Sequence, residues 1–250
     1  MRPMLFEGGV GSNSIWSADK PRPTGYRRGM VSVLGSEVSV LVDGVVVGLV
    51  GATGAQNGPS GPALVDLIGR ATVSAKAPDD EKARTAPVRD LLRHGKYKPT
   101  GRGKPASEYL LGAAREGRFP AVGALVDALN LVSLETLLPI SLIDLERAGT
   151  RQLSIRRGKP GESYVFNPSG QVLDVEDLLT VAVLPEDRAV ATPVKDSMST
   201  KLVPESREVL AVVWAPSSAR AALARAVASL EVLFKTHGAA AATAAAIASK

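Results

Sequence analysis

The sequence predicts an α+β protein with a mostly antiparallel sheet and helices packed on one side of it. Segments rich in β-branched residues lie both before and after a central region with helical periodicity. The strand segments of the second half are separated by short turns rather than by helices, which favours antiparallel pairing over a doubly wound parallel sheet. The chain has 250 residues, 45% of them hydrophobic, and can therefore bury one sizeable core.

The first part of the chain contains an irregular segment, two predicted strands and a helix. Residues 1–30 are rich in Gly, Pro and Ser and lack periodic apolar positions, so we expect a flexible arm there. In residues 36–52, β-branched residues flank Asp43-Gly44, which favours a two-residue hairpin turn between paired strands. A helix is expected at residues 62–71, and the alternating charges of residues 77–90 indicate an exposed helix or a linker.

Residues 93–144 form the centre of the predicted domain. Cations are interspersed with Pro and Gly in residues 96–105, which predicts a basic loop without regular secondary structure. A helix is expected at residues 106–116, because Pro105 suits a first helical turn and Gly117 suits a helix end.

A second central helix is predicted at residues 122–137, where apolar residues recur at about 3.6-residue spacing. Pro139 is expected to end it. Asn130 and Ser133 are three residues apart and therefore share one face of this helix. Asp144, beyond the proline, is best explained as a turn cap.

The second half indicates strands connected by turns. Residues 151–158 alternate as an edge strand does, and residues 164–175 are expected to form a hairpin around residues 167–170. Residues 177–195 repeat the strand, turn and strand pattern, and residues 207–216 predict a last strand.

A helix is predicted at residues 217–238, with Ser217 and Ser218 as candidate caps and an apolar stripe that must pack on the rest of the domain. The expected domain therefore spans residues 31–238. Residues 239–250 are rich in alanine, and we expect them to be a frayed tail or an extension of the helix, outside the domain.

Composition excludes several functional classes. The chain has no cysteine and only two histidines, which excludes disulfides, thiol nucleophiles and a multi-histidine metal centre, so neither a metal nor a cofactor is expected. The net charge of +5 is compatible with a polyanionic partner but does not require one. The N-terminus lacks a secretory pattern, and the longest apolar run, residues 44–55, is shorter than the about 20 residues that span a bilayer. We therefore expect a soluble, cytoplasmic protein without a membrane partner.

Residues 126–145, VDALNLVSLETLLPISLIDL, resemble the helix, proline and strand segment of the B3/B4 domain, the editing domain of the phenylalanyl-tRNA synthetase beta subunit. The resemblance covers about residues 96–147 and extends more loosely to about Pro216, and the basic loop is similar to that of free-standing relatives of the domain. The residues that carry it are Val126, Asp127, Asn130, Pro139, Asp144 and Leu145.

The resemblance implies a single α+β domain that binds the aminoacylated 3′ end of tRNA and hydrolyses in trans the ester of a mischarged amino acid. It implies no cofactor, and nothing in the sequence is similar to an aminoacylation core. Asn130 and Ser141 are then the catalytic candidates, Thr100, Ser107, Ser133 and Val213 would contact the substrate, and Lys96, Lys98, Arg102 and Lys104 would bind the RNA backbone.

The chain departs from the family at three positions. The family's histidine after the proline falls on Ser141, its helix threonine on Leu129 and its late-strand acid near Val213. A domain with these changes can hydrolyse a different substrate, use the ribose hydroxyl of the substrate, or only bind. The alternative function is therefore a non-catalytic module that binds tRNA or an amino-acid-like small ligand. If the protein is a deacylase, Val213 predicts an apolar or smaller aminoacyl group rather than tyrosine, because burying an unpartnered hydroxyl costs about 1–3 kcal/mol.

Overall fold

The computed structural model describes residues 29–77, 80–238 and 240–250. The strands are β1 (Met30–Val33), β2 (Ser36–Val40), β3 (Val45–Thr53), β4 (Ile140–Asp144), β5 (Gln152–Arg157), β6 (Ser163–Val165), β7 (Val172–Asp174), β8 (Leu179–Val183), β9 (Arg188–Ala191), β10 (Val209–Pro216) and β11 (Ala242–Ser249). The helices are α1 (Pro62–Ser74), α2 (Glu81–Leu92), α3 (Ala106–Arg115), α4 (Ala124–Thr136), α5 (Leu145–Ala148) and α6 (Arg220–His237), with short 3-10 helices at Gly101–Gly103 and Ser217–Ala219.

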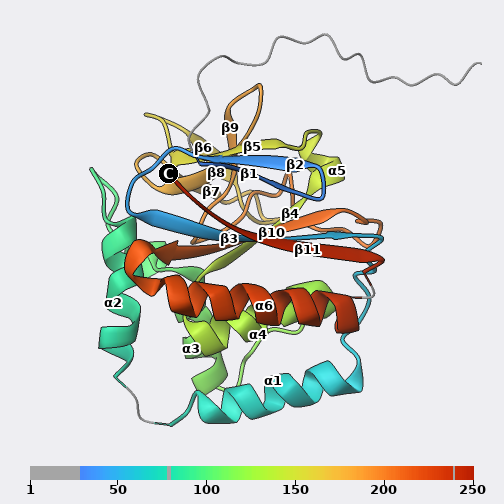
Figure 1. Cartoon of the computed structure of the whole chain (residues 1–250). Coiled ribbons are helices and arrows are strands. Elements are labelled where there is room, and N and C mark those ends of the chain that lie inside the picture. Colours follow the sequence, from blue (N-terminus) through green and yellow to red (C-terminus); the bar gives the residue numbers. More distant parts are fainter. Residues whose placement is uncertain (1–28, 78–79, 239) are drawn as a thin grey trace, which may run out of the picture.

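The elements are arranged in layers (Figure 1). A four-stranded sheet in the order β11-β3-β10-β4 lies in the middle, and all its pairs are antiparallel. A five-stranded sheet in the order β1-β2-β5-β8-β9 covers one face, and only its β2–β5 pair is parallel. The helices α1, α3, α4 and α6 lie on the other face (Figure 1). The predicted α+β class, with a mostly antiparallel sheet and helices on one side, is confirmed.

The central strand β10 contributes side chains to two hydrophobic cores. Leu210, Val212 and Trp214 pack between the two sheets, whereas Ala211 and Val213 pack against the helices. Both faces of β10 are covered, which explains why its sequence is a continuous apolar run rather than an alternating one.

The helix α6 lies close against the four-stranded sheet. A Cβ atom at Gly48 of β3 would lie 2.2 Å from a methyl group of Val227, so only glycine allows this approach. The apolar stripe predicted for this helix is buried, and its largest side chain, Phe234, is inaccessible to solvent. The capping role predicted for Ser217 and Ser218 is wrong, since both lie in a 3-10 turn and neither caps the α-helix with its side chain.

The predicted hairpin at Asp43-Gly44 is wrong, although both of its strands exist. β2 pairs with β1 and β5, and β3 pairs with β10 and β11, so the chain crosses from one sheet to the other at this turn. The tight hairpin turn lies instead at Leu34-Gly35, where both residues have positive φ. Leucine is an unusual residue at such a position, so this turn could not be predicted from residue type.

The prediction that residues 151–158 form an edge strand is also wrong. β5 lies between β2 and β8 in the middle of its sheet. Its alternation is real, because Leu153 and Ile155 face the core. The polar positions between them, Ser154 and Arg156, are nevertheless buried, because a network of charged residues covers the outer face of the strand.

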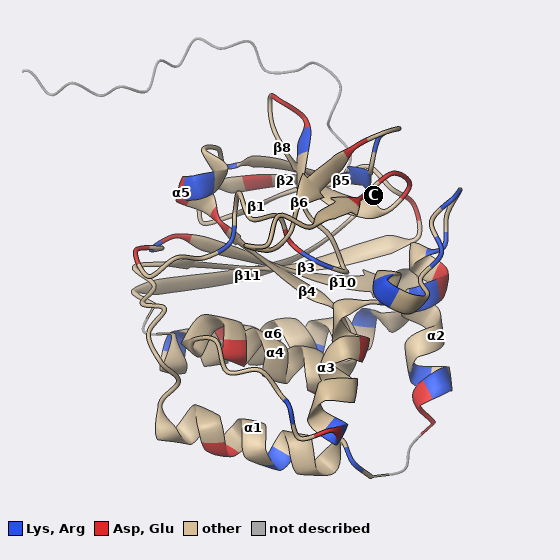
Figure 2. Ribbon diagram, turned by 180° about the vertical axis from the view of Figure 1, so that it is seen from behind, with Lys and Arg blue, Asp and Glu red and all other residues tan. Residues whose placement is uncertain are grey.

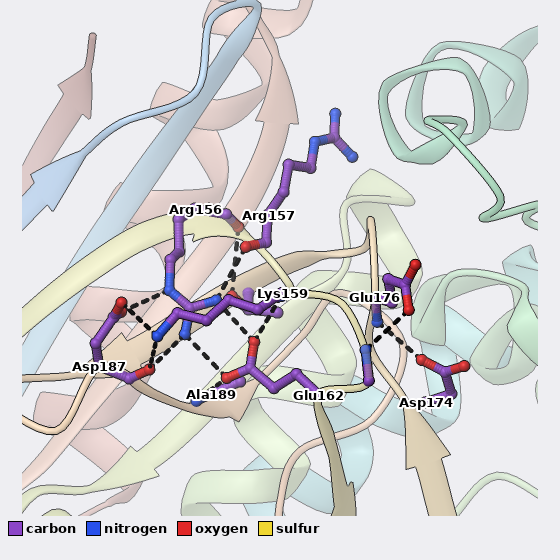
Figure 3. Close-up of polar contacts among 10 residues, drawn as sticks. Arg156, Arg157, Lys159, Glu162, Asp174, Glu176, Asp187 and Ala189 are labelled. Carbon is purple, nitrogen blue, oxygen red and sulfur yellow. Dashed lines mark hydrogen bonds and ion pairs between the residues drawn. The ribbon is translucent and has the colours of Figure 1, made fainter.

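This network is built around Arg156 (Figure 3). Its guanidinium group donates to both carboxylate oxygens of Glu162, at 2.8 and 2.9 Å, and to Asp187 at 2.6 Å. Glu162 also accepts from the backbone amides of Lys159 and Ala189. Burial alone would raise the pKa of Glu162, but these hydrogen bonds outweigh it and hold the pKa at about 2. The network fixes β5 to the turn before β9 and to the start of the β6–β7 ribbon.

The alanine-rich C-terminal segment is part of the domain, contrary to the expected tail at residues 239–250. Residues 242–249 form β11, which pairs with β3 over its full length. β3 is long and apolar, and without β11 its backbone would form an exposed edge. Tertiary pairing therefore overrides the helix propensity of alanine. The predicted arm at residues 1–30 lies outside the described residues except for its last two.

Candidate functional site

The predicted basic loop is an ordered structure at the start of α3. The Tyr97 hydroxyl donates to the carbonyl oxygen of Gly103 at 2.7 Å, and the Tyr109 hydroxyl donates to that of Gly101 at 2.9 Å. Tyr97 is half-buried, and burial raises the pKa of its hydroxyl. Tyr97 is therefore a packed anchor of the loop, whereas the ring of Tyr109 is exposed on its surface.

The cations of this loop differ in their surroundings. The Lys96 ammonium group pairs with Asp174 and Glu176 of the β7 region, and the Lys96 amide donates to Asp177. Lys96 therefore ties the loop to the body of the domain. The loop has three further cations that form no ion pair within the described part of the chain: Lys98, Arg102 and Lys104.

Two further lysines lie beside the loop. The amide of Ala106, at the start of α3, donates to the carbonyl oxygen of Pro193, which brings residues 192–201 next to the loop. The Lys195 ammonium group lies 4.0 Å from the centre of the Phe166 ring, and Lys201 donates to the Phe166 carbonyl oxygen. Burial and the nearby charges of Arg102 and Lys201 lower the pKa of Lys195, because each disfavours its protonated form.

We call this surface the basic face and define it by Lys98, Arg102, Lys104, Lys195 and Lys201. Figure 2 shows blue segments along the loop above α2, at one end of the helical layer. None of these five cations forms a salt bridge with an acidic side chain among the described residues. The exposed or half-buried rings of Tyr109 and Phe166 lie among them.

A carboxylate lies next to the basic face. Asp196 accepts from the amide of Leu142 at 3.0 Å and from the amide of Thr192 at 3.3 Å. The residue is only partly exposed, and burial raises the pKa of its carboxyl group. The two amides and the Ser141 hydroxyl oppose this effect, and the resulting pKa is about 6.

Ser141 is completely buried between the two sheets. Its hydroxyl donates to the carbonyl oxygen of Thr192 at 3.0 Å and accepts from the indole N–H of Trp214 at 3.0 Å. In this position it holds residues 192–196 through the Thr192 carbonyl oxygen and does not reach solvent. The Tyr164 hydroxyl donates to the Thr192 hydroxyl, so Ser141 and Tyr164 both hold the segment that carries Asp196.

The two predicted substrate-binding residues of the loop and α3 differ in exposure. Thr100 is exposed and precedes the 3-10 turn of the loop. Ser107 is buried in the first turn of α3, and its hydroxyl has no hydrogen-bond partner within the described residues.

The other predicted site residues lie on the helical side of the four-stranded sheet, opposite to the side that the Ser141 hydroxyl faces. Val213 is buried against the helices, while its neighbour Trp214 reaches Ser141 on the other face. The Ser133 hydroxyl donates to the Leu138 carbonyl oxygen, where it stabilises the end of α4. Asn130 is buried, and its side chain makes no hydrogen bond to a described residue. The structure thus brings the Ser141 hydroxyl and the start of α3 to the same segment, residues 192–196, whereas the Val213 side chain faces the helices and Asn130 and Ser133 lie on α4.

Asp144 has the structural role expected from the sequence. Its carboxylate accepts from the amide of Arg147 at 2.9 Å and caps the short helix α5. It is also hydrogen-bonded by the Ser206 hydroxyl. Sequence reasoning did not place Lys195 or Lys201 in the candidate site, because their approach to the loop depends on contacts distant in the chain.

The sequence matches no family model, and it matches none of the curated proteins. Within residues 29–77, 80–238 and 240–250, no helix is both long and apolar enough to cross a bilayer. The same residues contain no group of three His, Asp or Glu side chains placed to hold a metal ion.

Proposed function

We propose that the protein binds tRNA through the basic face and hydrolyses in trans the ester that joins a mischarged amino acid to the tRNA. The observation that carries this proposal is the basic face itself, whose five cations have no acidic partner among the described residues. Two of them, Lys195 and Lys201, lie beside Asp196, a residue that is only partly exposed. Cations without internal partners are suited to phosphate groups, and the adjacent aromatic rings are suited to unstacked bases.

In this proposal Asp196 acts as the general base. Its pKa of about 6 leaves the carboxylate mostly ionised at neutral pH and matched to proton transfer from water. The aminoacyl ester is already activated, so a water molecule that is positioned and deprotonated beside it is sufficient, and no covalent intermediate is required. Ser141 and Trp214 are positioning residues, because they hold the segment that carries Asp196. The resemblance to the B3/B4 domain in residues 126–145 supports the choice of substrate.

A second candidate function is tRNA binding without hydrolysis. The specific observation in its favour is that both oxygens of Asp196 already accept backbone amides, as a purely structural carboxylate does. The same basic face would then position an RNA that another protein modifies. The two functions differ in one readout, since only the first accelerates ester hydrolysis.

The basic face predicts the salt dependence of tRNA binding. Changing Lys98, Arg102 and Lys104 together to alanine should lower the affinity for tRNA by about tenfold or more at low salt, because fewer counterions are released on binding. The slope of log K against log salt should become shallower by about 2–3. Filter binding or fluorescence anisotropy between about 50 and 200 mM salt measures both quantities.

The matched control removes the same charges elsewhere. Lys82, Arg225 and Lys235 are exposed and lie on α2 and α6, outside the basic face. Their triple alanine variant should retain nearly all of the tRNA affinity. Equal losses in the two triple variants would show that binding depends on net charge alone and would refute the placement of the RNA interface.

A further inference from the structure

A cavity lies at the end of α3 that is distant from the basic face. It has a volume of about 680 Å³, opens to solvent, and is bordered by α1, by residues 57–60 and by residues 117–123. These three segments are distant in sequence and meet beside the start of α4. The volume lies within the range of about 300–1,000 Å³ that is typical of small-molecule sites.

Gly69 contributes open space to this cavity. It lies in the middle of α1 and lines the cavity, and a Cβ atom built there would meet no atom within 4 Å. Glycine within a helix costs about 0.5–1 kcal/mol relative to alanine. Packing within the described chain does not require glycine at this position, so the space above it is available to a ligand.

The wall of the cavity includes two buried acceptor groups, on Asp127 and Asn57. Asp127 is 2% exposed, and its carboxylate accepts from the Ser60 hydroxyl at 2.6 Å and from the Val122 amide at 2.8 Å. Both donors are neutral, and Asp127 has no ion pair with a described residue. The side-chain oxygen of Asn57 is buried without any hydrogen-bond partner in the described structure. A ligand group that donates several hydrogen bonds and carries a positive charge would complement these acceptors.

The rest of the cavity favours an apolar ligand body. Val65 and Val122 line it and remain 56% and 65% exposed, so their apolar surface is open to a ligand. Ile68 and Phe119 extend the same apolar surface inward. Lys76 lies at the edge of the cavity and is exposed to solvent, so its charge is hydrated.

We propose that this cavity binds a small amphipathic primary amine. Its ammonium group would be held by the carboxylate of Asp127 and the side-chain oxygen of Asn57, and its apolar part would pack against Ile68 and Phe119. This site is independent of the proposed action on tRNA, because it shares no residue with the basic face or with Asp196.

Three probes with a common phenylethyl body and different head groups test the proposal. The full-length protein is titrated with 2-phenylethylamine, 2-phenylethanol and 3-phenylpropanoate, and binding is measured by calorimetry and by NMR shifts. The amine should bind at least tenfold more tightly than the alcohol, and the carboxylate should bind most weakly. Absence of amine binding would overturn the proposal, as would a carboxylate that binds as tightly as the amine, since Lys76 would then be the anchor.

Two pairs of variants place the binding in the cavity. Gly69→Leu fills the space above α1 and should reduce amine affinity at least tenfold, whereas Gly112→Leu, at another open helical glycine outside the cavity, should leave it unchanged. Asp127→Asn should lose the preference for the amine over the alcohol, and the exposed Asp66→Asn should keep it. Gly69→Leu is expected to fold, because leucine favours a helix and its Cβ atom meets no neighbour there. Unchanged amine binding in this variant would refute the site.

Discussion

Removing residues 242–250 should lower the melting temperature by about 10 °C or more. The deletion removes β11, which pairs with β3 over eight residues and lies on the core between the two sheets through Ala244, Ala246 and Ala248. It would also expose the apolar edge of β3 and so promote aggregation. Thermal unfolding followed by circular dichroism, together with light scattering, measures both effects.

Single substitutions in β11 separate strand pairing from chain length. Ala248 is buried and Ala245 is exposed on the same strand, so Ala248→Asp should destabilise the fold by several degrees and Ala245→Asp by much less. If the truncated protein melted like the full-length chain, residues 242–249 would not be paired with β3 in solution.

Replacing Glu162 with glutamine should make the stability of the protein less dependent on acid pH. The pKa of Glu162 in the folded protein, about 2, lies below the ordinary value of about 4.3, so the stabilisation from its ionised form is fully present above about pH 5. It is lost as the pH falls from about 4.3 towards 2. After discounting for solvent screening, we expect Glu162→Gln to cost about 1–2 kcal/mol of unfolding free energy at pH 7.

The unfolding free energies of this variant and of the wild-type protein should converge as the pH falls to about 2 and below, where Glu162 becomes protonated in the folded protein as well. Urea unfolding at a series of pH values measures the difference. Glu186→Gln is the matched control, since Glu186 is exposed in the turn next to Asp187 and should change stability by about 0.5 kcal/mol or less. A constant difference between wild type and Glu162→Gln at every pH would show that packing, rather than the charge of Glu162, stabilises this network.

Local patterns in the sequence predicted the helices and strands themselves better than they predicted which strands pair with each other. The apolar stripe of α6 was sufficient to predict this helix, because the helix buries one face. The spacing of apolar residues also predicted α4, although this helix is buried on nearly every side. The pairing of β2, β3 and β5 was not predicted, because the choice of partner is made by contacts distant in the chain. β11 was missed for the same reason: an alanine-rich segment has no β-branched residues to mark it as a strand, apart from its threonine and isoleucine.

The candidate site was predicted in part. The basic loop was recognised from its composition, and the structure places Lys98, Arg102 and Lys104 on it without acidic partners among the described residues. Lys96 belongs to a structural contact instead, because Asp174 and Glu176 approach it from β7 and the residues that follow it. The position of Asp196 next to the basic face follows from the packing of residues 192–196 on Ser141. No local sequence pattern reveals this packing.

The proposed hydrolysis is tested most directly by the decay of a panel of aminoacyl-tRNAs with and without the protein. At least one tRNA that carries an apolar or small amino acid should be deacylated faster in its presence, and the added rate should rise with pH through about 6 as Asp196 ionises. Asp196→Asn should reduce this added rate by about 100-fold or more while tRNA affinity stays unchanged. Equal decay with and without the protein for every charged tRNA would contradict the proposed activity, and retained tRNA binding in that experiment would leave a binding module as its function.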